Sequence, residues 1–113
     1  MEVSSGPLIR GKTLKVGFEI QYTAEDGGNQ QGRIVIVAVT EDQALSYPKG
    51  IIKNTKLMIE KGEFFSVSRY REVRAELGPI PAGQTVKSVE ILIYKLSGEP
   101  LLRKTIQLQN ESH

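Results

Sequence analysis

Apolar and polar residues alternate one for one along much of the chain, and this pattern predicts β-strands. In residues 12–23 (KTLKVGFEIQYT) the apolar phase contains Leu14, Val16, Phe18, Ile20 and Tyr22, which is typical of a strand with one buried face. Residues 85–96 (TVKSVEILIYKL) and 101–108 (LLRKTIQL) predict two more strands, joined by a hairpin turn centred on Gly98. Residues 33–40 (RIVIVAVT) are apolar in both phases, which predicts a central strand covered on both faces.

The connections between these strands carry residues that favour turns. The stretches AEDGGNQQG and GPIPAGQ are rich in Gly, Pro, Asp and Asn, which predicts loops. Thr40 and Gln43 have the spacing of a capping box, which is typical of the start of a helical turn. Pro48–Lys56 is expected to be the least regular segment, and a short edge strand is predicted near Leu57–Ile59.

Residues 64–77 (FFSVSRYREVRAEL) form a strand pattern with an interruption. The phase that contains Phe65, Val67, Val73, Ala75 and Leu77 also contains Arg69 and Arg71. We expect a bulge or bend between Ser68 and Arg71, because burying an unpaired guanidinium costs several kcal/mol, whereas a lost ladder hydrogen bond costs about 1 kcal/mol net. The apolar side chains would then be buried and both guanidinium groups would reach water. Tyr70 would turn inward with its hydroxyl at the rim.

Two alternative interpretations of the arginines remain open. In one, both side chains point inward and pair with buried acids, for which Glu90 is the candidate in an otherwise apolar strand. In the other, the strand is regular and this phase lines a groove instead of a core. Arg69 and Arg71 would then bind a carboxylate or a phosphate.

Regularly spaced strands, with turn signals between them and almost no helical pattern, predict an all-β fold. We expect an antiparallel β-sandwich of six to seven strands, immunoglobulin/fibronectin-III-like. The disulfide and the core Trp of antibody domains are excluded, because the chain contains no Cys and no Trp. The 113 residues form one domain, which we divide into an N-terminal extension (1–11), the sandwich (12–108) and a polar tail (109–113).

Composition argues against an enzyme. The only histidine is the terminal His113, and cysteine is absent, so a thiol nucleophile, an imidazole base and the usual transition-metal ligands are missing from the predicted fold. We predict no catalytic residue, no metal site and no cofactor. The net charge of +2 is too small to indicate a nucleic-acid partner, and no apolar run approaches the roughly 18 residues that span a bilayer.

Basic residues supply the candidate binding site. The candidates are Lys53, Lys56, Arg69, Tyr70, Arg71 and Arg74. If the predicted edge segment pairs with the arginine strand, all six residues form one patch for an anion or a partner. The competing interpretation is an edge strand that is kept soluble by its charges.

Several stretches resemble a known kind of domain. LKVGFEI, VIVAV, GEFFSVSRYREVRAEL and VEILIYKLSGEPLLRKTIQL are similar to a globular β-domain of uncharacterised proteobacterial proteins that also contain a membrane-spanning helix and a coiled coil. The similarity runs from Leu14 to Leu108 and is most specific at Phe65–Tyr70. It implies the periplasmic side of the bacterial envelope, with anchoring by a segment that is not in this chain, and it implies no activity.

These observations lead us to expect a non-enzymatic interaction or structural module, monomeric or weakly dimeric, with a protein as partner. The alternative is a binding domain for an anionic ligand, such as a polysaccharide, a lipid headgroup or a peptide carboxylate. A third hypothesis, a hydrolase that uses carboxylates, would need a pocket with convergent acidic side chains.

Overall fold

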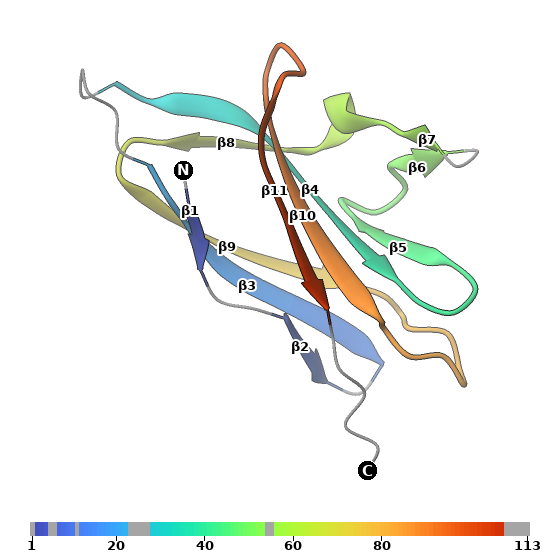
Figure 1. Cartoon of the computed structure of the whole chain (residues 1–113). Helices are drawn as coiled ribbons and strands as arrows, with labels where there is room; N and C mark the ends of the chain where they lie inside the picture. The colour runs from blue at the N-terminus through green and yellow to red at the C-terminus, as the bar shows by residue number, and fades with distance from the viewer. Residues whose placement is uncertain (1, 5–6, 11, 23–27, 54–55, 108–113) are drawn as a thin grey trace.

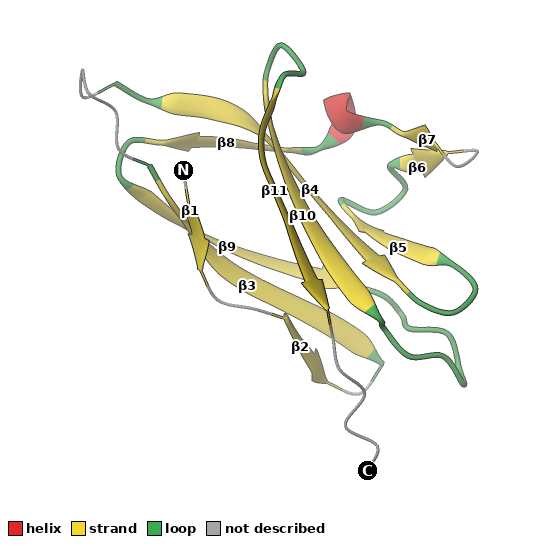
Figure 2. Cartoon of the chain, in the orientation of Figure 1, coloured by secondary structure: helices red, strands yellow, loops and turns green. Residues whose placement is uncertain are grey.

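The computed structural model describes residues 2–4, 7–10, 12–22, 28–53 and 56–107. Figure 2 shows that these residues form strands and loops together with one 3-10 helix, η1 (Ile59–Lys61). Because this helix spans 3 residues, nothing in the described ranges crosses a bilayer as a helix. Most of the strands form two antiparallel sheets that face each other (Figure 1), and two short strands form a separate hairpin. The predicted all-β antiparallel sandwich is confirmed.

The first sheet is built around β3 (Thr13–Gln21). On one side β3 pairs with β9 (Tyr70–Leu77), and on the other side it pairs with β1 (Glu2–Ser4) and β2 (Pro7–Arg10). Residues 2–4 and 7–10, which the sequence places in an N-terminal extension, are thus paired with the first sheet. The short strands β1 and β2 lack a long alternating pattern of their own, and they belong to the sheet because β3 supplies the neighbouring ladder.

The second sheet has β4 (Gln30–Val39) and β10 (Ser88–Lys95) at its centre. β11 (Pro100–Gln107) pairs with the outer side of β10. The other side of β4 is shared between two strands: its first half pairs with β8 (Glu63–Val67) and its second half pairs with β5 (Ala44–Tyr47). The expectation that β4 is a central strand is confirmed.

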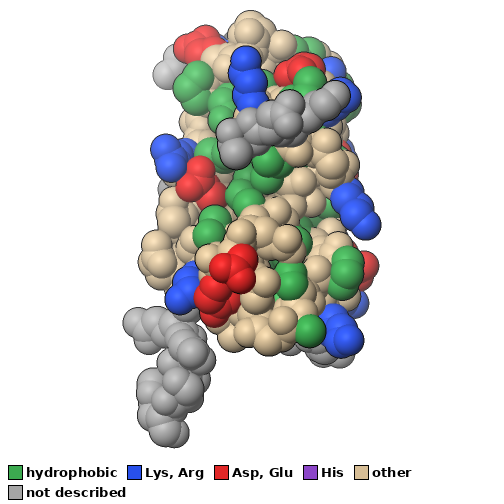
Figure 3. All heavy atoms as spheres, turned by 90° about the vertical axis from the view of Figure 1, so that its right-hand side faces the viewer, with side chains coloured by type: hydrophobic (Ala, Val, Ile, Leu, Met, Phe, Trp, Pro, Cys, Tyr) green, Lys and Arg blue, Asp and Glu red, His purple; other side chains and the backbone are tan. Residues whose placement is uncertain are grey.

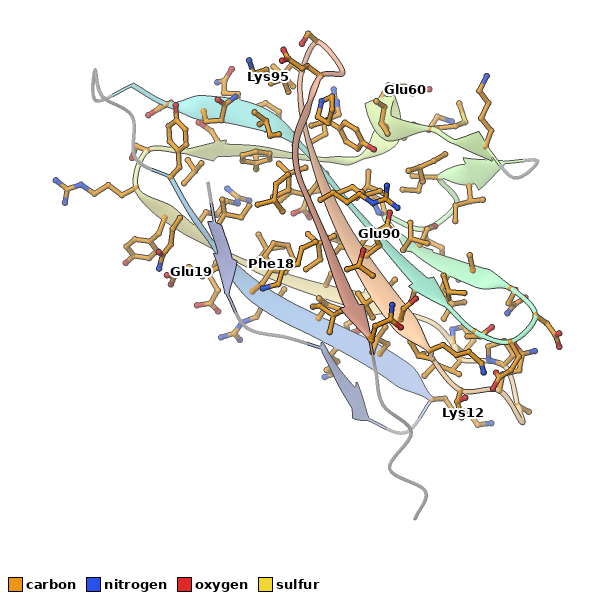
Figure 4. The ribbon with its side chains drawn as sticks, viewed as in Figure 1. Lys12, Phe18, Glu19, Glu60, Glu90 and Lys95 are labelled. Atoms are coloured by element: carbon orange, nitrogen blue, oxygen red, sulfur yellow. The ribbon has the colours of Figure 1, made fainter. Side chains whose placement is uncertain are left out.

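Inward-facing apolar side chains from both sheets form the main core. In Figure 4, Phe18 points into the space between the sheets and its neighbour Glu19 points away from it, as strand alternation requires. The first sheet contributes Leu14, Val16, Phe18, Ile20, Val73, Ala75 and Leu77, and the second sheet contributes Ile34, Ile36, Ala38, Phe65, Val67, Val89, Ile91 and Ile93.

A smaller apolar cluster covers the outer face of the second sheet. Val35 of β4 and Leu92 of β10 are buried on this face against Ile51. Ile51 belongs to the connection between β5 and β8, which folds back over the sheet. β4 is therefore covered on both faces, as its run of apolar residues predicts.

The connection that supplies this cover is irregular, as expected. β6 (Ile52–Lys53) and β7 (Lys56–Leu57) form a two-stranded hairpin of their own, and Ile59 begins η1. The edge strand predicted near Leu57–Ile59 is correct only at Leu57. Because β7 pairs with β6, it is not an edge strand of either main sheet.

Candidate functional site

The interrupted strand pattern corresponds to a crossing between the two sheets. β8 pairs with β4 in the second sheet, the chain bends at Ser68 and Arg69, and β9 then pairs with β3 in the first sheet. The predicted interruption is confirmed, and it is a bend between sheets instead of a bulge within one strand. Apolar residues on both sides of the bend face the same core, and the predicted buried residues Phe65, Val67, Val73, Ala75 and Leu77 are all buried.

Both arginines of the interrupted phase are exposed, as predicted. Arg69 lies in the bend, and Arg71 lies near the start of β9, where the core ends. The interpretation that they are buried and paired with Glu90 is wrong. Glu90 lies on β10 and accepts a hydrogen bond from Arg103 of β11, with Nη2 to Oε2 at 3.1 Å.

Tyr70 corrects one expectation. Its side chain is 67% exposed, so the predicted inward orientation is wrong. The reason is strand parity: Val73, Ala75 and Leu77 of β9 face the core, so residue 70 belongs to the opposite phase and faces outward.

Arg69, Tyr70 and Arg71, which we call the basic corner, are held by backbone contacts with β3. The Tyr22 N–H donates to the Arg69 carbonyl at 2.8 Å, and Tyr70 and Arg71 lie opposite Gln21 and Ile20 in the ladder. Among the described residues, no acidic side chain pairs with Arg69 or Arg71. The corner therefore presents two guanidinium groups and an aromatic ring on a fixed backbone.

The structure does not assemble the six predicted binding residues into one patch. Arg74 lies on the outer face of the first sheet, where its Nε is 2.5 Å from Glu72 Oε1. Lys53 and Lys56 lie opposite each other in the backbone ladder of the β6–β7 hairpin. This hairpin is at the opposite end of the molecule from the β8–β9 bend (Figure 1). The patch required β7 to pair with the arginine strand, and β7 pairs with β6 instead.

Charges on the face that carries β5 and the β6–β7 hairpin are interspersed. Figure 3 shows hydrophobic side chains along the middle of this face, with Lys, Arg, Asp and Glu distributed around them. Arrangements of this kind favour solubility more than the binding of a polyanion. The basic corner is thus the part of the predicted site that the structure keeps together.

A polar contact that the sequence did not reveal joins two loops at the other end of the sandwich. The Glu41 carboxylate accepts hydrogen bonds from the Thr85 N–H at 2.8 Å and from Thr85 Oγ1 at 2.7 Å. These hydrogen bonds, from the side chain first and then from the backbone, lower the pKa of Glu41 below its usual value. The contact fastens the β4–β5 loop to the loop before β10, a structural role.

The adjacent Thr40 is the buried polar residue of the same loop. Its Oγ1 accepts a hydrogen bond from the Gln43 N–H at 3.2 Å and lies 2.6 Å from Gln84 Oε1. The capping-box spacing therefore indicated a real contact between Thr40 and Gln43. The backbone there is a turn between β4 and β5, however, and the expected helical turn is wrong.

In the described ranges, no group of three or more His, Cys, Asp or Glu side chains comes together to hold a metal ion. The polar tail and His113 lie outside the described residues. No family model, curated protein or solved structure matches the chain. The function must therefore be inferred from the chemistry of the described surface.

Proposed function

We propose that this chain is a non-enzymatic interaction module of the immunoglobulin/fibronectin-III class that binds an acidic protein surface through the basic corner. The strand order supports the class. Immunoglobulin-type sandwiches have strands A, B and E in one sheet and C, F and G in the other. Here the N-terminal strands, β3 and β9 form one sheet, and β4, β10 and β11 lie in the other with β5 beside β4. This order agrees with A-B-E and G-F-C, and strand D has no counterpart beside β9 in the described residues.

The observation that carries the binding role is the exposed, unpaired state of the corner. Among the described residues, Tyr70 is the most exposed large hydrophobic residue, and in the sequence it lies between two arginines that no described acidic residue neutralises. Tyr and Arg are the residue types enriched at the energetic centres of protein interfaces.

The chemistry of the corner favours a carboxylate-bearing partner. A guanidinium forms bidentate hydrogen bonds with a carboxylate, which fixes both the position and the orientation of the contact, and the corner offers one such group on each side of Tyr70 along the chain. Because the β3–β9 ladder holds the backbone, the backbone of the corner loses little conformational freedom on binding, and the ordering cost falls on the two arginine side chains. Association should be faster at low ionic strength, as expected for complementary charges.

The envelope setting is part of the proposal. It rests on the resemblance of Leu14–Leu108 to the periplasmic β-domain of anchored proteobacterial proteins, and an interaction module suits a protein that displays a domain away from the membrane. Fractionation of cells that produce the full-length protein tests this part separately: recovery of the domain in the cytosol would contradict it.

The binding role can be tested by capture from an envelope extract. The immobilised domain is compared with Arg69→Glu/Arg71→Glu, and a matched control, Lys12→Glu/Lys61→Glu, makes the same change of charge at exposed residues outside the corner. The control should capture as much of a corner-dependent partner as the wild type does. The corner variant should capture at least about tenfold less, the change expected for a loss of about 1.4 kcal/mol in binding free energy. The partner's binding as a purified protein should weaken with salt.

Two outcomes would contradict the proposal. Equal capture by the wild type and the corner variant would exclude the corner as the contact. Salt-sensitive binding of the domain to vesicles that contain phosphatidylglycerol, or to a sulfated polysaccharide, without a protein partner, would instead support the anionic-ligand alternative. Far-ultraviolet circular dichroism of both variants checks that the fold is retained.

A further inference from the structure

β9 presents a free edge on the first sheet. Its ladder to β3 occupies one side, and no other strand in the described ranges pairs with it. The hydrogen bond from the Tyr22 N–H to the Arg69 carbonyl identifies the odd-numbered residues of β9 as those that face β3, because hydrogen-bonded pairs alternate along an antiparallel ladder. The backbone groups of Tyr70, Glu72, Arg74 and Glu76 therefore point to the free edge.

The side chains on this edge alternate in charge. Glu72, Arg74 and Glu76 are all exposed on the outer face of the first sheet. Glu72 also lies directly opposite Glu19 of β3, which is an unfavourable pair of like charges. A positive side chain placed on the other side of Glu72 would offset this repulsion, and in the single chain that role falls to Arg74, two residues further along the same strand.

We propose that two copies of this chain form a dimer by antiparallel pairing of β9 with β9, centred on Val73. In this register Glu72 of each copy lies opposite Arg74 of the other, and Tyr70 lies opposite Glu76. All four residues with free backbone groups then pair with the four of the second copy. The row across the joined sheets becomes Glu19, Glu72 and the second copy's Arg74, with alternate charge restored at the interface.

Alternative registers are less favourable. A shift by one residue would place the core-facing phase against the outward-facing phase. Centring the pair on Glu72 or on Arg74 would place like charges opposite each other at the two-fold axis. Centring it on Ala75 keeps Arg74 opposite Glu76, but it leaves the backbone of Tyr70 without a partner. Charge, length and hydrogen-bonding phase therefore agree only at Val73.

The outer edge of the second sheet does not share this property. Arg103 and Lys104 are adjacent in the middle of β11, so self-pairing about its centre would oppose two arginines or two lysines. Like charges in this position are a common protection against edge-to-edge association. The two sheets thus differ: β11 is guarded by charges of one sign, and β9 carries a self-complementary pattern.

The dimer extends the proposed function and does not depend on it. Arg69 lies beyond the paired segment, so each end of the interface would carry one free Arg69, whereas Tyr70 and Arg71 of the basic corner lie within the pairing. Eight residue steps of about 3.4 Å place the two Arg69 positions about 27 Å apart along the strands. A partner with two acidic sites at that spacing would bind both Arg69 side chains with higher avidity than one.

Sedimentation equilibrium of purified protein tests the dimer, with Glu72→Arg, Arg74→Glu and the double exchange Glu72→Arg/Arg74→Glu. Each single change gives residues 72 and 74 the same charge. These residues face each other at two symmetry-related positions of the interface, so dimerisation should weaken at least about tenfold. The double exchange restores opposite charges and should return the dissociation constant to within about threefold of the wild type. A control exchange of the Glu90–Arg103 pair on the second sheet, Glu90→Arg/Arg103→Glu, should leave the dissociation constant of the dimer unchanged.

Three results would overturn the proposal: a wild type that stays monomeric up to millimolar concentration, single variants that dimerise as tightly as the wild type, or a double exchange that fails to recover. Thermal melts of each variant, monitored by circular dichroism, confirm that the changes at these exposed positions leave the monomer folded. The double exchange distinguishes a lost interface from a lost fold, because it alters the same two residues as the single variants.

Discussion

Tyr47 donates a hydrogen bond to Glu63 across the gap between two strands that share one edge of β4. Tyr47 ends β5 opposite Ile36, and Glu63 begins β8 opposite Ile34. The long connection between β5 and β8 leaves the sheet at this gap and returns to it. The hydrogen bond therefore joins the two half-strands at the point where the backbone ladder is interrupted.

Loss of this hydrogen bond should destabilise the domain. Tyr47→Phe keeps the ring that packs against the main core and removes the donor, so we expect a loss of about 1–2 kcal/mol in the free energy of unfolding. Tyr94→Phe is the matched control, because the Tyr94 hydroxyl has no hydrogen bond in the described part of the chain, and it should change stability by less than about 0.5 kcal/mol. Equal effects in urea melts would show that Glu63 contributes nothing.

The same contact predicts a pH dependence in the alkaline range. The hydrogen bond to Glu63, followed by burial, raises the pKa of Tyr47 to about 12 from its ordinary 10.0. A raised pKa in the folded state gives stability that is present below pH 10 and is lost as the pH rises toward 12. The stability difference between the wild type and Tyr47→Phe should therefore shrink over this range, and a constant difference would contradict the assignment. Urea melts at several pH values measure it.

Glu41 predicts the opposite dependence in acid. Hydrogen bonds from Thr85 lower its pKa from 4.5, so its contribution to stability is present above pH 4.5 and is lost as the pH falls through the lowered value. Glu41→Gln should be less stable than the wild type at neutral pH, and the two should converge in acid. Glu60→Gln, at an exposed glutamate of η1, serves as the control. Parallel curves of unfolding free energy against pH for the wild type and Glu41→Gln would contradict the assigned role of the Glu41–Thr85 hydrogen bonds.

Local patterns predicted the parts of the fold that depend on neighbouring residues. The alternation of β3, the two-sided apolar run of β4 and the turn at Gly98, with its φ of 97°, are all properties of short segments. The exposed arginines could also be predicted, because the energetic cost of burying an unpaired guanidinium exceeds that of bending a strand. The basic corner is thus visible in the sequence.

The remaining features depend on contacts between distant segments. Glu41 and Thr85 are separated by 44 positions, and only the fold brings their loops together. Residues 2–4 and 7–10 form two strands because β3 supplies a ladder, whereas their own pattern is too short to indicate a strand. The predicted patch of lysines and arginines is wrong for a similar reason. It required the weak strand β7 to pair with the arginine strand, and a single sequence does not identify which strand a weak segment pairs with.

Two glycines in strands should respond oppositely to alanine. A Cβ on Gly32 would lie 2.1 Å from the Tyr94 carbonyl oxygen and 2.9 Å from Phe65 Cε1, so Gly32→Ala must displace backbone and should cost about 1–3 kcal/mol or more. A Cβ on Gly17 meets nothing within 4 Å, and Gly17→Ala should be neutral or slightly stabilising because glycine weakens a strand interior. Denaturant melts of both variants measure the contrast, and a tolerated Gly32→Ala would contradict the packing at β4.

The last prediction compares the exposed arginines with their buried neighbour in β9. Arg69→Ala and Arg71→Ala should each change the free energy of unfolding by less than about 1 kcal/mol, because both side chains are exposed and lack acidic partners in the described ranges. Val73 is 3% exposed, and Val73→Ala should cost roughly 1–3 kcal/mol through the cavity that it leaves. Urea melts of the three variants decide the ranking. If either arginine variant proved the more damaging, that guanidinium would be part of a charge network that holds the two sheets together. The corner would then be needed for the fold itself and would not be free to bind a partner.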